Sequence, residues 1–574
     1  MANRTDMLDG GALAARTLRE AGVEVVFALH GGHLDTFLTG CRRYGIRLVD
    51  CRHEAAAVNA ADGYARSTGR LGVAAVTSGP GLFNSIGGIS AAAADGVGVL
   101  VITSSPPLGE AETRELQGGL DQIAAVRPIT KWAHRVTSTS RIPDLVGLAV
   151  RHAQGGQPGP VVLDIPIDVG FTSVDPSKLA AAGKPEIAPR PVPPTRSIAS
   201  LAELIDASER PVVVVGDGSL AMDFRSELDD FAEATGIPVF RSGLSRGGLS
   251  RGHKLNAGGI FSLMALPALG AGTPDLVILV GASHGLFLGG RRFYPMCAGA
   301  KMAQIHLDAA EIGRLGPVDV GVVGDIGPAL TAVSAAVAPT DRSAWAGTAV
   351  AMKNFASSLY EGAAMEDDGI HPFRIAADIA AEIEPGTILV RDGGEAAQWM
   401  DWATGDLDLT ADLGLGFQGH LGVGQGYSIG AQIAYPERRV VQVVGDGAIG
   451  FHIQEWDTMV RHKLPIVTVV FNNSCWGMSI HGQHAVYGPE GDVISRLAPT
   501  RYDLVAEGFG AFGQNVTDVA ELRPAIKRAM EAGTTAVVNV ATSATIVHPV
   551  TATLLGSVSP DDEVVVPYYD NIPK

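Results

Sequence analysis

The sequence predicts an α/β protein with three doubly wound domains, each built on a parallel sheet, and a C-terminal tail. Three observations lead to this prediction. The chain has 574 residues, which is too long for one ordinary domain of roughly 100–200 residues. Short runs of β-branched residues alternate with alanine-rich stretches of helical pattern, as in parallel sheets covered by helices. Two stretches interrupt this alternation and divide it into three parts.

The interruptions place the domain boundaries. The stretch 183–197 contains five prolines and cannot sustain a helix or a central strand. The stretch 338–345 is a weaker linker between two helical runs. The expected parts are a first domain over 1–182, a middle domain over 195–338, a third domain over 355–545 and a tail over 546–574.

Each domain contains apolar runs of the length of buried parallel strands. In the first domain these runs are 25–29, 47–50, 72–78, 98–104 and 159–165. In the middle domain they are 211–217, 275–281 and 302–308. In the third domain they are 387–393, 439–446, 464–472 and 535–541.

The composition excludes several classes of protein. Hydrophobic residues make up 46% of the chain and charged residues 18%, which excludes a disordered chain. With 43 basic and 61 acidic residues the formal net charge is −18, which argues against partners such as nucleic acid or an anionic membrane. The N-terminal residues lack the apolar core of a signal peptide, and no apolar run approaches the roughly 20 residues of a membrane span, so we expect a cytoplasmic protein.

The densest motif lies at 443–477, where a buried strand ends in Gly445-Asp446-Gly447 and a second strand ends in Asn472-Asn473. Polar groups at the carboxyl ends of parallel strands converge at one edge of the sheet. Asp446 offers a carboxylate oxygen, Asn473 an amide oxygen, and the chain just after Asn473, at Cys475, a backbone carbonyl. With phosphate oxygens and a water these groups would make an octahedral Mg²⁺ site. The motif resembles the diphosphate-binding motif of thiamine-diphosphate enzymes.

Thiamine chemistry needs a second carboxylate, which hydrogen-bonds the cofactor's aminopyrimidine ring and favours its imino tautomer. Glu54 follows the expected strand 47–50 and opens an alanine-rich helix. Taken alone, a glutamate at a helix start indicates a cap or a solvated charge. Together with the diphosphate motif, it is the candidate activator of the cofactor.

Nearly the whole chain resembles the acetolactate-synthase-like and pyruvate-oxidase-like thiamine-diphosphate enzymes, in the order pyrimidine-binding, middle and diphosphate-binding domain. Within this group it is most similar to benzaldehyde lyase and the 2-hydroxyacyl-CoA lyases. The stretches that carry the likeness are LHGGHLDTF (29–37), CRHEAAAVNAADGYAR (51–66), LQGGLDQ (116–122), ITKWAHRV (129–136) and NNSCWGMSIHGQ (472–483).

The resemblance implies roles for further residues. His33 and Gln117 would face the substrate carbonyl and hydroxyl, with Gly32 beside them. Gly419 would accept a hydrogen bond from the aminopyrimidine, and Leu421 would be the apolar wedge that bends the cofactor. The other cofactor-binding candidates are Gly393, Gly394, Gly445, Gly447, Ala448, Asn473, Trp476, Gly477 and Met478. Glu54 would come from a neighbouring subunit, which implies a homo-oligomer, commonly a dimer of dimers.

The implied reaction is cleavage of a carbon–carbon bond, and two lyase substrates compete. A 2-hydroxyacyl-CoA lyase would release formyl-CoA and a ketone or aldehyde, whereas a benzaldehyde lyase would split an aromatic acyloin. The cationic loop 241–254, with Arg246 and Arg251, suits the phosphates of coenzyme A and favours the first, although it could equally be a solvated turn. Glu490, on a loop after the metal motif, is a candidate for positioning the leaving carbonyl.

Other possibilities stay open. The apolar tail 546–574 could cover the site as a lid or pack in an oligomer. Asp308 and Asp325, at the ends of middle-domain strands, could hold the ribose of a bound ADP. A non-catalytic nucleotide-binding protein is the alternative from another class of function, and an acetolactate synthase is the alternative enzyme.

Overall fold

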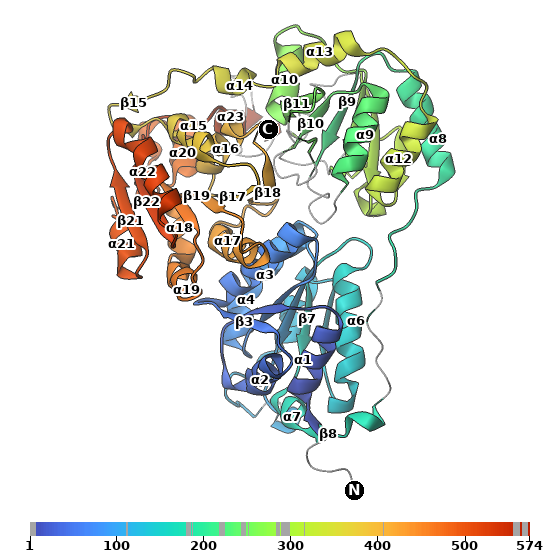
Figure 1. Cartoon of the computed structure of the whole chain (residues 1–574), viewed down its shortest axis with the longest axis vertical. Helices are drawn as coiled ribbons and strands as arrows, with labels where there is room; N and C mark the ends of the chain where they lie inside the picture. Colours follow the sequence, from blue (N-terminus) through green and yellow to red (C-terminus); the bar gives the residue numbers. More distant parts are fainter. Residues whose placement is uncertain are drawn as a thin grey trace. The chain divides into compact units, whose positions relative to one another are not determined.

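The computed structural model describes two compact units of the chain, and we treat each unit by itself (Figure 1). Unit 1 combines 1–189, 418–437 and 452–464, and unit 2 combines 190–417, 438–451 and 465–574. The described residues are 7–110, 113–179, 185, 187–216, 224–242, 248–250, 252–282, 288, 299–314, 316–405, 407–554, 563–564 and 572–573. From residue 552 onward only the backbone is described.

Unit 1 contains a six-stranded parallel sheet whose four inner strands are completely buried. Its strands, from edge to edge, are β3 (Arg47–Asp50), β2 (Val25–Ala28), β4 (Gly72–Ala75), β5 (Val99–Thr103), β7 (Val161–Asp164) and β6 (Trp132–Arg135). A short antiparallel pair, β1 (Leu8–Asp9) and β8 (Ser173–Val174), joins the ends of the domain.

Helices form two packed groups in unit 1: α1 packs against α2 and α6, and α3 packs against α4 and α17. The alanine-rich sequence of α3 permits its close contact with α17, where a Cβ added at Gly430 would lie 2.1 Å from the Ala60 carbonyl oxygen. The helices are α1 (Gly10–Glu20), α2 (Asp35–Arg43), α3 (Glu54–Thr68), α4 (Pro80–Ala94), α5 (Gln122–Val126), α6 (Ile142–Gln154), α7 (Ile167–Phe171), α17 (Val423–Ala434) and α19 (Glu455–Arg461).

Unit 2 contains two more six-stranded parallel sheets. The first consists of β11 (Asn256–Gly259), β10 (Val239–Arg241), β9 (Pro211–Val215), β12 (Leu276–Val280), β13 (Lys301–His306) and β14 (Val320–Val323). The second consists of β18 (Leu409–Gly414), β17 (Thr387–Asp392), β19 (Val440–Gly445), β20 (Val467–Asn472), β22 (Ala536–Ala541) and β21 (Phe512–Val516). The predicted class, three parallel-sheet α/β domains, is therefore confirmed.

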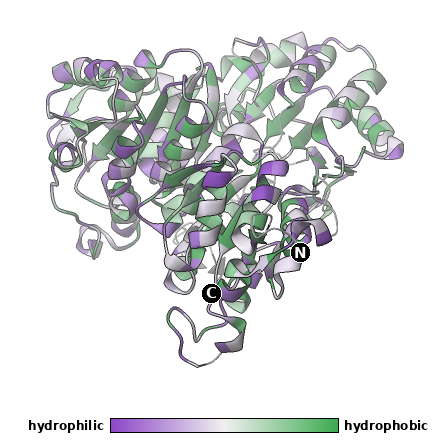
Figure 2. Cartoon of the chain, turned by 60° about the horizontal axis from the view of Figure 1, so that its bottom comes forward, coloured by the Kyte–Doolittle hydropathy of each residue, from purple (hydrophilic) through white to green (hydrophobic). Residues whose placement is uncertain are grey.

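Helices and short hairpins complete unit 2, and the apolar side chains of the strands form the cores of both of its domains (Figure 2). The helices of the middle domain and its linker are α8 (Thr195–Asp206), α9 (Arg225–Thr235), α10 (Ile260–Ala268), α12 (Ile326–Ala336), α13 (Ser343–Ala351) and α14 (Phe355–Ser358). Those of the third domain are α15 (Pro372–Glu382), α16 (Glu395–Ala403), α18 (Asp446–His452), α20 (Gly477–Tyr487), α21 (Tyr502–Gly508), α22 (Val519–Glu531) and α23 (Pro549–Leu554). The two-stranded pairs are β15 (Met365–Glu366) with β16 (Gly369–Ile370) and β23 (Glu563–Val564) with β24 (Ile572–Pro573). Within the described part of the chain, no helix is both long and apolar enough to cross a membrane.

The beginning of the predicted tail is docked on the third domain. The His548 ring lies 4.3 Å from the ring of Trp399 and 4.3 Å from that of Trp402. The Thr551 hydroxyl donates a hydrogen bond to Glu395 Oε1 at 2.7 Å. Most of the tail beyond 554 lies outside the described residues, so the lid stays a prediction.

Docking of this segment is expected to depend on pH. Burial lowers the pKa of His548 to about 3, below its usual 6.5, so its contribution to stability is present above pH 6.5 and is lost as the pH falls toward 3. At pH 5 the lost free energy of unfolding is about 2 kcal/mol. We expect that His548→Asn, which keeps the capping acceptor for the Val550 N–H, destabilises the protein less at pH 5 than at pH 7.5, measured by urea unfolding. An equal destabilisation at both values would contradict this.

Candidate active site

Three neighbouring strands of unit 1 each end in a candidate site residue. Glu54 follows β3, His33 follows β2, and Ser78 follows β4. Because β3, β2 and β4 are adjacent and parallel, these residues gather at one edge of the sheet.

Glu54 is the first residue of α3 and is 7% exposed. Its Oε2 accepts a hydrogen bond from Asn84 Nδ2 at 3.1 Å, and the His53 ring caps the helix by accepting from the Ala55 N–H. Among the described residues no cation lies within ion-pair distance of Glu54. The carboxylate is thus buried and held by an amide, with its Oε1 available to a ligand.

His33 and Gln117 are joined through a residue that the sequence did not single out, Ser78. His33 Nδ1 lies 2.5 Å from Ser78 Oγ, and Ser78 Oγ donates to Gln117 Oε1 at 3.0 Å. When Ser78 donates to Gln117, His33 donates through Nδ1, so its Nε2 keeps a lone pair that can accept a proton. Thr77 also donates to Gln117 Oε1, at 3.2 Å.

The loop that carries Gln117 is tightly constrained. Gln117 has a φ of +60°, which is uncommon for a residue with a side chain, and its carbonyl oxygen would lie 2.8 Å from a Cβ added at Gly79. Ser78 lies between the buried strand β4 and the Gly79-Pro80 pair that begins α4. This position at the end of a buried strand is the one signal in the sequence that could have identified Ser78 as a site residue. Gly32 lies beside His33 in a short 3₁₀ turn.

Gly419 and Leu421 lie in the same unit as Glu54, in the turn before α17. Gly419 is exposed with a φ of +61°, and a Cβ there would meet nothing within 4 Å. Since α17 packs on α3, this turn and Glu54 belong to elements in direct contact. Their predicted roles toward the aminopyrimidine stay predictions.

In unit 2 the diphosphate and metal candidates also follow three adjacent strands. Gly393 and Gly394 follow β17, Asp446 begins α18 directly after β19, and Asn473 follows β20. The sequence motif predicted that the carboxyl ends of β19 and β20 would lie close together.

Asp446 has the electrostatics of a cation ligand. It is 3% exposed, its Oδ1 accepts from the Gly447 N–H at 3.1 Å, and its buried Oδ2 has no hydrogen-bond partner among the described residues. Burial raises the pKa of Asp446 to about 7, although the backbone N–H groups of Gly447, Ser474 and Cys475 oppose the rise. An unpartnered buried carboxylate oxygen is costly, and a divalent cation would relieve that cost.

The other predicted ligands suit magnesium through oxygen atoms. Asn473 Oδ1 faces the Cys475 N–H at 3.3 Å. Burial raises the pKa of the Cys475 thiol to about 12, so Cys475 would contribute its carbonyl and not a thiolate. In the described part of the chain no group of three His, Cys, Asp or Glu side chains could hold a metal ion. The candidate donors are a carboxylate, an amide oxygen and a backbone carbonyl, which are oxygen ligands of the kind that a hard cation shared with phosphate oxygens takes.

Glycines bring the neighbouring loops together at this edge. A Cβ at Gly447 would lie 2.6 Å from the Trp476 ring, and one at Gly394 would lie 3.1 Å from the Met478 side chain. Gly393 has a φ of +95°, and a Cβ there would lie 3.1 Å from the Gly445 N–H nitrogen. At Gly445 itself a Cβ would meet nothing within 4 Å, which leaves space for a ligand. Ala448 is buried, and Gly477 begins α20.

The predicted substrate residues are less well placed. Arg246 and Arg251 lie outside the described residues. Glu490 is exposed in a short 3₁₀ turn, Pro489–Gly491, and no contact of the described residues links it to the candidate site. Its catalytic role stays a prediction.

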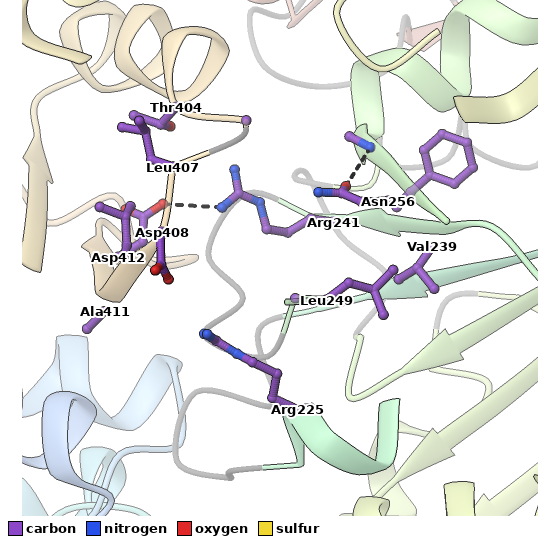
Figure 3. Close-up of a pocket in the computed structure, with 15 residues that line it drawn as sticks. Arg225, Val239, Arg241, Leu249, Asn256, Thr404, Leu407, Asp408, Ala411 and Asp412 are labelled. Atoms are coloured by element: carbon purple, nitrogen blue, oxygen red, sulfur yellow. Dashed lines mark hydrogen bonds and ion pairs between the residues drawn. The ribbon is translucent and has the colours of Figure 1, made fainter. Parts of the chain in front are cut away.

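Arg241, at the start of the cationic loop, serves within the fold. It lies 3.3 Å from Asp401 and 3.5 Å from Asp412, beside a hollow that is lined by β10 and, among others, by Thr404, Leu407, Asp408, Leu409, Ala411 and Asp412 (Figure 3). Both aspartates also pair with the buried Arg391. Arg241 is therefore held by carboxylates, and it weakens rather than supports the inference of a phosphate-binding loop.

The middle-domain aspartates are also engaged. Asp308 accepts from the Ala310 N–H at 2.9 Å, and Asp325 lies 3.6 Å from Arg190. These contacts are typical of a helix cap and a surface ion pair, and they give no support to a bound ADP.

Comparisons with known proteins cover the same three domains. Family models of the thiamine pyrophosphate enzymes match the chain: the N-terminal TPP binding domain over 8–125, the central domain over 198–333 and the C-terminal TPP binding domain over 394–540. The acetolactate synthase large subunit of Mycobacterium tuberculosis is 34% identical over 551 residues, which covers 94% of this chain and 97% of that protein. The 2-hydroxyacyl-CoA lyase 2 of Danio rerio is 30% identical over 585 residues, covering 91% and 89%. The 2-hydroxyacyl-CoA lyase 2 of Caenorhabditis elegans is 29% identical over 555 residues, covering 89% and 84%.

Replacing Asp446 should weaken ligand binding without lowering the stability of the ligand-free protein. A carboxyl whose pKa is raised to about 7 carries a buried charge at pH 8 and lowers the stability of the ligand-free protein there. We therefore expect Asp446→Asn at pH 8 to unfold at the same or a higher temperature without ligand. Its affinity for Mg²⁺ with thiamine diphosphate should fall at least about tenfold, measured by calorimetry.

The matched control is Asp518→Asn, which changes an exposed helix cap in the same domain and should leave binding unchanged. Unaltered magnesium binding by Asp446→Asn would rule out the metal site.

Proposed function

The chain belongs to the thiamine pyrophosphate enzymes, and on that premise we propose that it is a carbon–carbon lyase acting on a 2-hydroxyacyl-CoA. A substrate such as 2-hydroxyisobutyryl-CoA would give formyl-CoA and a ketone, here acetone. The reverse reaction, which joins the two products, uses the same residues.

The cofactor-binding residues divide between the two sheet edges. Asp446, Asn473 and the Cys475 carbonyl would hold Mg²⁺, and the glycines after β17 and β19 would admit the diphosphate close to the backbone. Glu54 would bind the aminopyrimidine ring through its free carboxylate oxygen. When bound, thiamine diphosphate supplies a carbon nucleophile and accepts the electron pair of the broken carbon–carbon bond.

The observation that carries the proposal is the hydrogen-bonded chain His33–Ser78–Gln117. Cleavage beside a hydroxyl requires that the hydroxyl proton be removed and that a proton be delivered to the product. His33 Nε2 can accept the first, because Nδ1 is engaged with Ser78. Ser78 and Gln117 fix the ring and can follow its change of protonation by reorienting their own hydrogen bonds.

Full-length similarity to two 2-hydroxyacyl-CoA lyases supports the thioester substrate. A specific observation also favours a second candidate: an acetolactate synthase is 34% identical over nearly the whole chain. Acetolactate formation would use the same sites to join two pyruvate molecules, one of which loses its carboxylate as CO₂. Benzaldehyde-lyase-type cleavage is the third alternative.

The resemblance further suggests that Glu54 and Asp446 of one complete site come from different subunits. We therefore propose a homo-oligomer, a dimer of dimers, in the cytoplasm. Recovery of activity on mixing inactive Glu54→Gln and inactive Asp446→Asn subunits tests the shared site, since a mixed dimer would regain one intact site, and analytical ultracentrifugation of the wild-type protein tests the oligomeric state.

The substrate is tested by supplying 2-hydroxyisobutyryl-CoA, pyruvate and benzoin separately to the protein loaded with thiamine diphosphate and Mg²⁺. We expect acetone and formyl-CoA from the first. Acetolactate from pyruvate with no turnover of the thioester would establish the second candidate. Benzaldehyde from benzoin alone would establish the third.

Replacing Ser78 tests the hydrogen-bonded chain. We expect Ser78→Ala to lower kcat by about 10²-fold, in the range of a general acid–base contribution, while leaving the affinity for thiamine diphosphate unchanged. Ser85→Ala removes a buried hydroxyl that bonds only within α4, to the Leu82 carbonyl at 2.6 Å, and should be nearly silent. Equal kcat values for the two variants would remove the relay from the mechanism.

A further inference from the structure

We propose that helix α19 is a clamp that sets the position of Glu54, with Glu455 as its positioning residue. The inference rests on the proposed role of Glu54 as the group that activates thiamine diphosphate. Its basis is a set of contacts, all within unit 1, between α19 and the turn that connects β3 to α3.

The turn is short and has little structure of its own. β3 ends at Asp50 and α3 begins at Glu54, so residues 51–53 decide where the Glu54 carboxylate lies. The backbone of Cys51 still pairs with β2, through its N–H to the Ala28 carbonyl. The next residues depend on contacts from elsewhere.

Glu455 supplies the central contact. Its Oε1 and Oε2 both accept from the Arg52 N–H, at 3.0 and 3.2 Å. Thr458, one turn further along α19, donates to Glu455 Oε2 at 2.7 Å. Glu455 is 0% exposed, and among the described residues no cation lies within ion-pair distance of it.

Burial of a carboxylate without a cation lowers the stability of the fold, so the presence of Glu455 indicates a role other than stabilisation. Burial raises the pKa of Glu455 to about 7, although the Thr458 hydroxyl and the N–H groups of Arg52 and His53 oppose the rise. The Arg52 N–H, two residues before Glu54, thus faces both oxygens of one buried carboxylate. Such an arrangement fixes the backbone more firmly than a side-chain contact would.

Further residues of the helix bind the residue that begins the turn. Arg461 donates to the Asp50 carboxylate at 2.6 Å and to the Asp50 carbonyl at 2.9 Å. His462 Nε2, just after the helix, lies 2.8 Å from the other carboxylate oxygen of Asp50. Asp457 pairs with Arg461 at 2.7 Å and lies 3.8 Å from the Arg52 side chain. The clamp therefore grips the turn at Asp50 and at Arg52, immediately before Glu54.

The chain continuity of α19 adds to its importance. α19 follows α18, whose first residue is the proposed magnesium ligand Asp446. One segment of sequence therefore provides both the metal ligand and the element that positions the activating carboxylate.

The test replaces Glu455 by glutamine. Glutamine replaces one of the two acceptor oxygens by an NH₂ donor, which then faces either the Arg52 N–H or the Thr458 hydroxyl, so the two-oxygen contact with the Arg52 N–H is lost. We expect Glu455→Gln, loaded with thiamine diphosphate and Mg²⁺, to exchange the cofactor's C2 proton with deuterium at least tenfold more slowly. The circular-dichroism band of the imino tautomer should weaken, and the cofactor's dissociation constant should stay within threefold of wild type.

Two controls accompany this variant. Glu24→Gln removes a carboxylate of unit 1 that pairs with Arg70 at 2.9 Å. Glu24 directly precedes β2, so it lies at the amino ends of the strands, away from Glu54, and its replacement should leave the C2 proton exchange unchanged. Arg461→Lys keeps the charge but loses the two-pronged contact with Asp50, and it should slow exchange in the same direction. Because the Arg461 side chain is 35% exposed, this variant decides the question if Glu455→Gln does not fold.

The outcomes separate this inference from the proposed function. Wild-type exchange and a wild-type tautomer band in Glu455→Gln and Arg461→Lys, with only a lower melting temperature, would reduce α19 to a structural contact and overturn the clamp. Unchanged exchange in Glu54→Gln would instead overturn the role of Glu54. No substrate is needed for either measurement.

Discussion

Buried carboxylates held by neutral donors, at the carboxyl edges of parallel strands, are the constraint on which the proposed chemistry depends. Glu54 is held by an amide, Glu455 by the Arg52 N–H and a hydroxyl, and Asp446 by a backbone N–H, with one oxygen that has no partner in the part of the chain that the structure describes. Transfer of such groups from water is unfavourable unless their hydrogen bonds are remade. The sheets make this possible because they bring several loop N–H groups to one edge.

The same protein also buries carboxylates in an entirely different way. Asp62 and Asp95 both bind the buried Arg66, and Asp412 binds Arg391. In these clusters a guanidinium donates hydrogen bonds to the carboxylates. They hold α3 in its own domain and β17 against β18, so their role is structural. Burial of an acidic residue therefore does not identify a functional site; the nature of its donors does.

Most of the inner strands could be predicted from the sequence because apolar residues dominate them. All of the runs expected as strands correspond to strands of the three sheets, from 25–29 in β2 to 535–541 in β22. It missed β6, β10, β11, β14, β18 and β21, five of which are edge strands. An edge strand is covered on fewer sides, so sequences such as Trp132–Arg135 and Phe512–Val516 mix polar and apolar residues and lack the expected pattern.

Contacts distant in sequence account for the residues that could not be predicted. The convergence of the β19 and β20 ends follows from strand alternation, so Asp446 and Asn473 were accessible from a motif. The pairing of Glu455 with Arg52 spans 403 residues and follows no spacing rule. Arg241 is another case, since its pairing with Asp401 and Asp412 could not be read from the cationic loop, whose phosphate binding through Arg246 and Arg251 stays a prediction.

The choice of neutral donors also has a chemical reason. A carboxylate beside arginine is held in its charged form, because the cation stabilises the anion far more than the acid. A group that shares a proton with a cofactor ring must instead pass between both forms at little cost. An amide partner such as Asn84 permits this, since it can bind either form of a carboxyl group. The Arg52 N–H that binds Glu455 has a different consequence: it fixes the backbone before Glu54 without placing a positive side chain beside the Glu54 carboxylate. The fold thus separates the two requirements of the activating residue, with proton sharing left to Glu54 and its precise placement assigned to α19.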